Sequence, residues 1–186
     1  MKTTGVLVIA LLTFCITHVS AKTWYDKDVR VAQLGVGIGG LGGGYGTSSI
    51  PVISVGLDFG LTKEISVGGI AGYSSSKFDG LYGFQNSRYS WKYTYITLGA
   101  RGSYHFLQVP NEKLDLYAGL GLGFNIVSSK YDGTAVNQAL IVGASGSYMF
   151  LGIHAGARYS FSGNFAVYGE LGYGLGILNV GIALKV

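Results

Sequence analysis

Cysteine, proline and charge are all scarce in this chain of 186 residues. The only cysteine is Cys15, and the two prolines are Pro51 and Pro110. One cysteine forms no internal disulfide, so the fold must be stabilised by another device. Charged residues make up 12% of the sequence, which is about half of the usual fraction in a soluble domain. The net charge of +4 is too small to indicate a nucleic-acid partner.

The sequence also has no continuous apolar run long enough for a helical span, which excludes a helical membrane protein. The apolar stretch Gly5–Ile16 is too short for that role and follows the positive charge of Lys2. Val19–Ala21 then supplies small residues at the positions that signal peptidase reads. We therefore predict a cleavable signal peptide over residues 1–21.

The mature domain is predicted to comprise residues 22–186 and to contain no cysteine. Phe14 precedes Cys15, where a lipoprotein signal requires Gly or Ala, so no lipidation is predicted. Cysteine-based zinc, iron–sulfur and thiol chemistry are thereby excluded.

Glycine and alternating apolar residues dominate the predicted mature domain. From Leu114 to Phe124 every second residue is apolar, and the residues between them are small or polar. Successive side chains of a strand point to opposite faces, so this segment is predicted to be a strand with one apolar face.

The same alternation marks eight candidate strands along the chain. They cover residues 32–38, 53–61, 65–73, 96–106, 114–124, 151–161, 165–173 and 178–186. A tilted strand needs about 9–11 residues to cross the hydrocarbon, which these segments approach. The predicted fold is all-β, an eight-stranded antiparallel up-and-down transmembrane barrel with lipid outside and a polar lumen.

The connections between these strands alternate in length. Short turns at 62–64, 107–113 and 162–164 alternate with long polar segments at 74–92 and 127–147. Bacterial outer-membrane barrels have short periplasmic turns and longer outer loops, so both termini are predicted to lie in the periplasm. Lipid-facing aromatics at the strand ends predict two interfacial belts. They are Phe59, Tyr104, Phe106, Tyr159, Phe161 and Phe165 beside the short turns, and Tyr73, Phe124 and Tyr173 at the opposite ends.

Several segments resemble a known family, namely Lys113–Gly119, Gly123–Tyr131, Gly156–Tyr159, Gly169–Gly174 and Leu178–Gly181. They are similar to the small outer-membrane β-barrel proteins of Gram-negative bacteria, the OmpX-like or OmpA transmembrane-domain-like group, often called porin-family proteins. The resemblance covers the predicted mature domain. It implies an integral outer-membrane location after export by the general secretory route. Members usually end in an aromatic residue that the assembly machinery recognises, whereas this sequence ends with Val186.

Charged residues on the predicted inward faces form a candidate site. Pairing across the turn at 162–164 sets Gly156 opposite Glu170, with Arg158 one diagonal step away. Buried charges are tolerated when they are paired and hydrogen-bonded. The predicted structural ion-pair cluster consists of Asp58, Arg101, Arg158 and Glu170. It lies nearer the periplasmic end and plugs a lumen that is just wide enough for side chains. A gated polar path is the alternative.

Other inward residues raise two further questions. The inward set also contains Tyr95, His105, Asp115, Tyr117, His154, Tyr168 and Asn179. The many inward glycines either hold the rings of Tyr117 and Tyr168 or leave a cavity for a small ligand. A lipid-modifying enzyme needs a histidine near a nucleophile, and nothing in the sequence places His105 or His154 there. No catalytic residue, cofactor or metal site is therefore predicted. Gly35–Gly40 matches a phosphate-binding pattern by letters only, because no helix follows it.

The long segment 74–92 supplies the predicted interaction surface. Its candidate residues are Phe78, Tyr82, Phe84, Arg88, Tyr89 and Trp91. Aromatic and basic residues suit binding to proteins or to lipopolysaccharide, and equally suit loop packing or extended strands.

The predicted function is a structural or surface-interaction role in the cell envelope, with a narrow porin-like channel for small solutes as the alternative. Predicted partners are outer-membrane lipid, lipopolysaccharide, the assembly machinery, and an extracellular protein or surface ligand bound through the outer loops. The protein is predicted to be a monomer.

Overall fold

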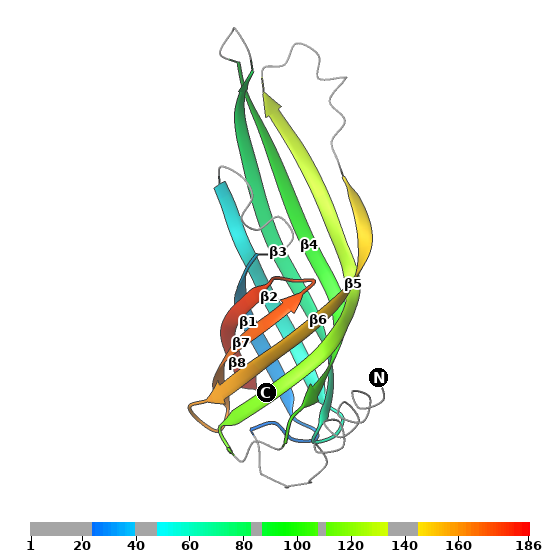
Figure 1. Ribbon diagram of the computed structural model, residues 1–186, viewed down its shortest axis with the longest axis vertical. Helices are drawn as coiled ribbons and strands as arrows, with labels where there is room; N and C mark the ends of the chain where they lie inside the picture. The colour runs from blue at the N-terminus through cyan, green and yellow to red at the C-terminus, as the bar shows by residue number, and fades with distance from the viewer. Residues whose placement is uncertain (1–23, 40–47, 83–86, 108–110, 134–144) are drawn as a thin grey trace, which may run out of the picture.

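The computed structural model is a closed antiparallel barrel in which each strand pairs with its neighbours along the chain. It describes residues 24–39, 48–82, 87–107, 111–133 and 145–186. The strands are β1 (Arg30–Ile38), β2 (Ser48–Gly60), β3 (Ile65–Tyr82), β4 (Ser87–His105), β5 (Leu114–Gly133), β6 (Gly146–Ser160), β7 (Phe165–Tyr173) and β8 (Leu178–Lys185). The predicted fold class is thereby confirmed, and Figure 1 shows the tilted strands.

The barrel closes because β1 pairs with β8. The register runs from Val31 opposite Lys185 to Ile38 opposite Leu178. A closed sheet leaves no unpaired edge, which is the condition for a sheet to span lipid. None of the described residues form an apolar helix of membrane-spanning length.

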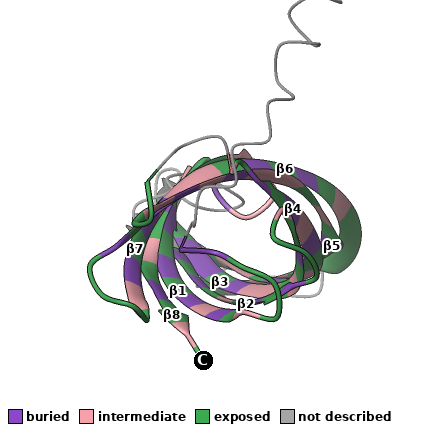
Figure 2. Cartoon of the chain, turned by 90° about the horizontal axis from the view of Figure 1, so that it is seen from below, coloured by how far each residue is buried: buried purple, intermediate pink, exposed green. Residues whose placement is uncertain are grey.

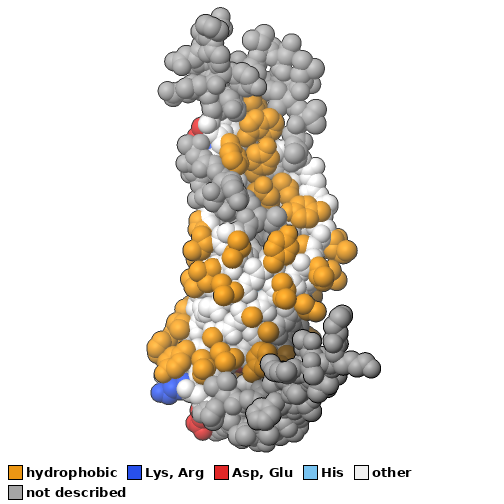
Figure 3. Space-filling model, viewed as in Figure 1, with side chains coloured by type: hydrophobic (Ala, Val, Ile, Leu, Met, Phe, Trp, Pro, Cys, Tyr) orange, Lys and Arg blue, Asp and Glu red, His pale blue; other side chains and the backbone are white. Residues whose placement is uncertain are grey.

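The barrel has a polar interior and an apolar outer surface. Along each strand buried and exposed residues alternate, as the striped colouring of Figure 2 shows. Leu120 and Ile182 are 61% and 37% exposed, whereas Arg158 and Asp58 are both fully buried. This distribution is the reverse of a water-soluble fold and fits a surface wetted by acyl chains. Figure 3 shows hydrophobic side chains spread over the surface, with charged ones toward the ends.

The wall of the barrel has two heights. β3, β4 and β5 contain 18, 19 and 20 residues, whereas β1, β7 and β8 contain 9, 9 and 8. The longer strands rise well above the others in Figure 1. We call the part of β3, β4 and β5 beyond Tyr73, Ile96 and Ile126 the upper extension.

The upper extension favours the extended-strand alternative for segment 74–92 and corrects the polar loop predicted at 127–147 over residues 127–133. Residues 74–82 and 87–92 continue β3 and β4, and residues 127–133 continue β5. Polar residues fill these stretches because both faces lie beyond the hydrocarbon, so apolar alternation is lost although backbone pairing persists. The pairing is continuous from Ile65 opposite Tyr104 to Tyr82 opposite Ser87.

Aromatic side chains mark the end of the barrel that carries the short turns. Tyr104 packs against Phe106 at a centroid distance of 5.3 Å, and Tyr159 against Phe161 at 5.4 Å. All four are exposed on the outer surface. This arrangement is that of an interfacial belt.

A segment before β1 closes the same end, which the pattern of the sequence did not predict. Trp24 Nε1 donates to the Gly163 carbonyl at 3.2 Å, and Lys185 Nζ lies 4.6 Å from the centre of the Trp24 ring. Asp28 N donates to the Gly60 carbonyl at 3.0 Å. Asp28 has a φ of 62°, a left-handed conformation that Asp tolerates better than most residues.

Candidate functional site: the polar lumen

The candidate site is a network of charged side chains that come from strands all around the barrel. Its members are Asp58 on β2, Arg101 on β4, Asp115 on β5, Arg158 on β6 and Glu170 on β7. Each occupies an inward position of the strand alternation and is buried. We call these five residues the ion-pair network.

Arg101 connects one half of the ion-pair network. Its Nε and Nη2 donate to Asp58 Oδ1 and Oδ2 at 2.9 and 2.7 Å, a bidentate pair. Its Nη1 donates to Glu170 Oε2 at 3.1 Å. Bidentate arginine–carboxylate pairs are among the strongest hydrogen-bonded contacts in proteins and fix both partners in orientation.

Arg158 connects the other half and is fully buried. Its Nη2 donates to Asp58 Oδ2 at 2.8 Å, and its Nη1 donates to Asp115 Oδ2 at 3.0 Å. The guanidinium carbon also lies 4.2 Å from the centre of the Tyr117 ring, a cation–π contact. Its Nε is buried without a hydrogen-bond partner among the described residues.

Asp58 is the residue that both arginines share. It accepts from Arg101 and Arg158, and Gln33 Nε2 donates to its Oδ2 at 2.5 Å. Tyr117 OH donates to Glu170 Oε2 at 3.1 Å, which adds a neutral donor to the second carboxylate. Two guanidinium groups thus face three carboxylates, and neutral donors supply further bonds.

The structure brings the four residues of the predicted cluster together, but the pair expected across the turn, Arg158 with Glu170, does not form. Gly156 is opposite Glu170, as the turn implies. Glu170 nevertheless pairs with Arg101, whereas Arg158 pairs with Asp58 and Asp115. Pairing along one hairpin is readable from the sequence, but contacts across the lumen depend on how the sheet closes.

Each lumenal histidine lies beside a serine, a proximity that the sequence did not predict. His154 Nε2 lies 2.8 Å from Ser103 Oγ. His105 Nε2 lies 3.0 Å from Ser66 Oγ, and its Nδ1 lies 2.7 Å from Asp115 Oδ1. These neighbours come from different strands, so sequence spacing did not reveal them. All five groups are buried.

Tyr25 covers His105 from the end that carries the short turns. The two rings are parallel within 3°, with centroids 3.6 Å apart. Tyr25 is 1% exposed, and burial raises the pKa of its hydroxyl to about 12. The side chain therefore stays neutral over the physiological range and forms a second layer below the ion-pair network.

Inward glycines hold the rings of two tyrosines. A Cβ on Gly156 would lie 2.7 Å from the Tyr117 ring, and a Cβ on Gly181 would lie 2.8 Å from the Tyr168 ring. Both distances are shorter than carbon atoms tolerate, and the backbone carbonyls of Gly169 and Leu34 crowd the same two positions, so only glycine fits between each ring and the neighbouring strand. At Gly156 and Gly181 the glycines therefore hold tyrosine rings and do not leave a cavity for a ligand.

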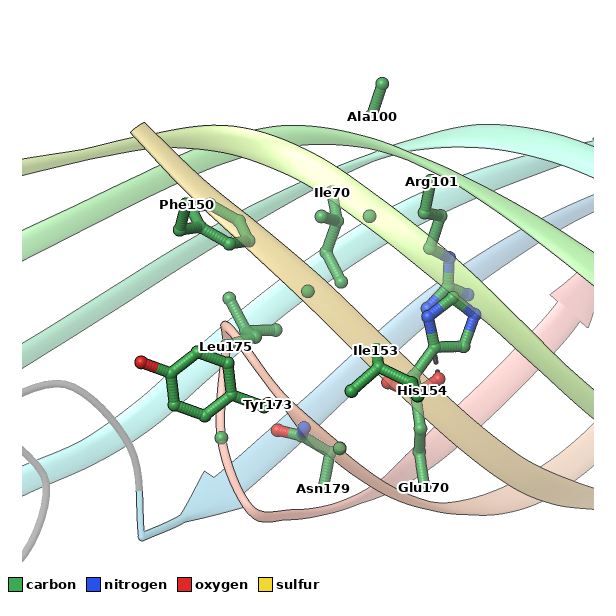
Figure 4. Close-up of a pocket in the computed structure, with 14 residues that line it drawn as sticks. Ile70, Ala100, Arg101, Phe150, Ile153, His154, Glu170, Tyr173, Leu175 and Asn179 are labelled. Atoms are coloured by element: carbon green, nitrogen blue, oxygen red, sulfur yellow. Dashed lines mark hydrogen bonds and ion pairs between the residues drawn. The ribbon is translucent and has the colours of Figure 1, made fainter. Parts of the chain in front are cut away.

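A cavity lies on the other side of the ion-pair network, toward the upper extension. Its volume is about 40 Å³. In Figure 4, Arg101, His154 and Glu170 lie at one end and Phe150 and Leu175 at the other. Gly121, Gly152 and Gly172 line it as well.

The predicted interaction residues are placed only in part. Phe78 and Trp91 lie on β3 and β4, where Trp91 and Phe78 each pack against Tyr93, with centroids 6.1 and 5.8 Å apart. Tyr82, Arg88 and Tyr89 belong to the same two strands rather than to a loop. Phe84 lies outside the described residues.

Comparison with known protein families agrees with this architecture. The family described as outer membrane protein beta-barrel domain matches residues 6–180. The chain therefore belongs to this family and is an integral protein of the outer membrane.

Two solved structures show the same fold. OprG from Pseudomonas aeruginosa superposes with a TM-score of 0.63 at 10% sequence identity, covering 89% of this chain and 99% of OprG. The N-terminal β-barrel domain of Pseudomonas aeruginosa OprF gives a TM-score of 0.52 at 15% identity, covering 87% of this chain and 99% of that domain. At such low identities the likeness concerns the fold alone. None of the curated proteins matches this sequence.

Proposed function

We propose that this protein has a structural and surface-interaction role in the outer membrane and that its own side chains close the lumen. The observation that carries the proposal is the ion-pair network, in which Arg101 and Arg158 reach Asp58 from different strands. The two arginine–Asp58 pairs cross the lumen at the same height along the barrel axis.

The energetics favour a closed lumen over a hydrated path. A buried ion pair that loses one partner is destabilised by about 3–5 kcal/mol. A permeating ion would have to compete with Arg101 or Glu170 for partners that already lie at 2.7 to 3.1 Å. Tyr25 stacked on His105 adds a separate obstruction nearer the periplasm.

The upper extension supports the surface role. It projects a three-stranded sheet beyond the membrane, held by continuous pairing between β3, β4 and β5. Its aromatic residues include Trp91 and Tyr131, whose ring centroids lie 5.1 Å apart. Aromatic side chains on a rigid sheet bind partners at a low entropic cost.

A narrow channel is the second candidate, and the cavity is the observation in its favour. The cavity reaches down to Arg101 and Glu170, so a rearrangement of these two side chains would extend it toward the periplasm. In that case the ion-pair network would act as a gate rather than as a plug.

Single-channel recording in planar bilayers separates these functions. The wild-type protein is expected to show no stable conductance. A variant with Tyr25→Ala, Arg101→Ala and Arg158→Ala removes the Tyr25 layer and both arginines that reach across the lumen to Asp58, and it should conduct. Lys63→Gln, in an exposed turn, is the matched control and should be silent. Reproducible wild-type conductance would support the channel instead.

Complementation tests the envelope role in cells. A strain without the protein should become more sensitive to detergent, and the wild-type gene should restore resistance. A variant with Phe78→Ala and Trp91→Ala should restore detergent resistance yet lose surface adhesion. Full adhesion by this variant would contradict an interaction role for the aromatics of the upper extension.

A further inference from the structure

Three lysines of the upper extension stand side by side on adjacent strands. Lys77 on β3 is directly opposite Lys92 on β4, and Lys92 is directly opposite Lys130 on β5. All three are exposed. We call them the lysine row. Side chains directly opposite each other in an antiparallel sheet lie about 5 Å apart, and like charges at this distance destabilise the pair.

The lysine row lies on the outer surface of the barrel rather than toward the lumen. Residues that are two apart along a strand lie on the same face of the sheet. Lys77 follows the lipid-facing Tyr73 by four residues and therefore shares its face. The same spacing separates Lys92 from Ile96 and Lys130 from Ile126, and these three residues are all exposed apolar side chains. The lysines therefore continue the face that meets lipid.

The composition of this face changes in steps with height. Above the row of Tyr73, Ile96 and Ile126 comes a row of hydroxyl side chains, formed by Ser75, Thr94 and Ser128. The lysine row follows, and the row above it contains Asp79, Ser90 and Asp132. The face thus passes from apolar to hydroxyl to cationic to acidic.

The height of the lysine row matches the head groups of the outer leaflet. The outward residues from Ile96 on β4 to Phe106, just beyond its end, span about 25 Å along the barrel axis. This length follows from a rise of about 3.3 Å per residue and a tilt of about 40°, and it equals the usual height of the apolar band. Four more residues place the lysine backbone about 10 Å above that band. Lysine side chains bend toward an interface with their ammonium groups in the polar layer.

The carboxylates on this face belong to the same arrangement. Asp79 Oδ1 lies 3.3 Å from Lys77 Nζ, with both side chains about half exposed. Asp132 lies in the same higher row. These acidic groups are farther from the membrane than the lysines, so the cationic layer is the one nearest to the lipid.

We propose that the lysine row binds the phosphate groups on the sugar head of lipopolysaccharide in the outer leaflet. Anionic phosphates between the ammonium groups would remove the repulsion that the register imposes, and Thr94 and Ser128 would add hydroxyl donors just below. The row would hold a shell of lipid against the tall side of the barrel, formed by β3, β4 and β5. The inference uses the outer-membrane location and is independent of whether the lumen is closed.

Binding of purified lipopolysaccharide to the full-length mature protein in phosphatidylcholine nanodiscs tests this. The wild-type protein should bind intact lipopolysaccharide at least tenfold more tightly than enzymatically dephosphorylated lipopolysaccharide. A variant with Lys77→Gln, Lys92→Gln and Lys130→Gln should bind intact lipopolysaccharide about 100-fold more weakly, since each lysine near an anionic surface contributes a factor of about five.

A matched variant controls for net charge. Lys27→Gln, Lys63→Gln and Lys113→Gln removes three exposed lysines at the opposite end and should bind like the wild type. On gels, unboiled samples of every variant should migrate differently from boiled samples, which would show that all variants are folded. Inorganic phosphate at millimolar concentration should not compete.

Three results would overturn the proposal. They are unchanged binding by the variant of the lysine row, equal binding of dephosphorylated lipopolysaccharide, and full competition by inorganic phosphate, which would indicate a site for soluble anions. Conductance of the wild-type protein, by contrast, would refute the closed lumen without affecting this inference.

Discussion

Arg158 on β6 donates from Nη2 to Oδ2 of Asp58 on β2 at a distance of 2.8 Å. In a closed barrel of eight strands, β2 and β6 lie on opposite sides. The contact therefore crosses the whole lumen and joins two walls that share no backbone hydrogen bond. Because Asp58 also accepts a hydrogen bond from Arg101 on β4, its carboxylate connects the strands β2, β4 and β6.

Asp58→Asn should destabilise the barrel strongly, because it leaves Arg101 and Arg158 without their shared charge. The expected loss in free energy of unfolding is about 3–5 kcal/mol, measured by urea unfolding in lipid vesicles. Asp132→Asn, an exposed site, should change it by less than about 0.5 kcal/mol. Adding Arg158→Met to Asp58→Asn should restore part of the loss. Equal stability of Asp58→Asn and wild type would refute the role of the shared carboxylate.

Gly156→Ala should destabilise the protein because the new Cβ meets the ring of Tyr117. Overpacking of this kind costs about 1–3 kcal/mol in free energy of unfolding. Gly169→Ala on the neighbouring strand is the matched control, since nothing lies within 4 Å of its Cβ. In the Tyr117→Leu background Gly156→Ala should cost less than in the wild type, and the cost that remains reflects the Gly169 carbonyl, 2.8 Å from the same Cβ. An identical cost at Gly156 and Gly169 would show that the ring does not need the glycine.

Stability should fall at high pH through Tyr25. Burial raises the pKa of Tyr25 to about 12, above the ordinary value of 10.0, so the unfolded chain loses this proton first. The neutral hydroxyl therefore contributes full stability below pH 10, and the contribution disappears as the pH rises toward 12. Unfolding midpoints between pH 9 and 12, compared with those of Tyr25→Phe, isolate this effect. Parallel curves for the two proteins would contradict it.

Neither lumenal serine should react as a nucleophile, although each has a histidine neighbour. Ser66 and Ser103 are 1% and 4% exposed, and Tyr25 covers His105 on the side toward the short turns. A fluorophosphonate probe followed by mass spectrometry should therefore leave both serines unlabelled. Labelling that Ser66→Ala abolishes would instead indicate a reactive serine and reopen the enzymatic interpretation. Lipid A mass spectra with and without the protein provide the second check.

Local alternation explains why the strands were predictable. From Leu114 to Phe124 each inward or outward position depends only on whether its number is odd or even, and the structure starts β5 at Leu114 as expected. The same alternation gave no warning that β5 continues to Gly133. Beyond the hydrocarbon both faces meet polar surroundings, so a paired strand and a loop have similar composition there.

The candidate site was predictable in its members more than in its contacts. Asp58, Arg101, Arg158 and Glu170 were identified because a charge at an inward position must be buried. The contact between Arg158 and Asp58 was not predicted, because these two residues are separated by 100 residues in the chain. The covering role of Tyr25 was missed for the same reason, as it precedes β1 and follows no strand period.

The sequence by itself predicted the outer-membrane barrel, because eight strands of period two, short turns that alternate with long segments, and aromatic residues at the strand ends are together typical of such barrels. Only the tertiary structure decided which charges meet across the lumen and which lysines become neighbours. Closure of the sheet and the register of each strand pair set those distances, and both depend on all eight strands together.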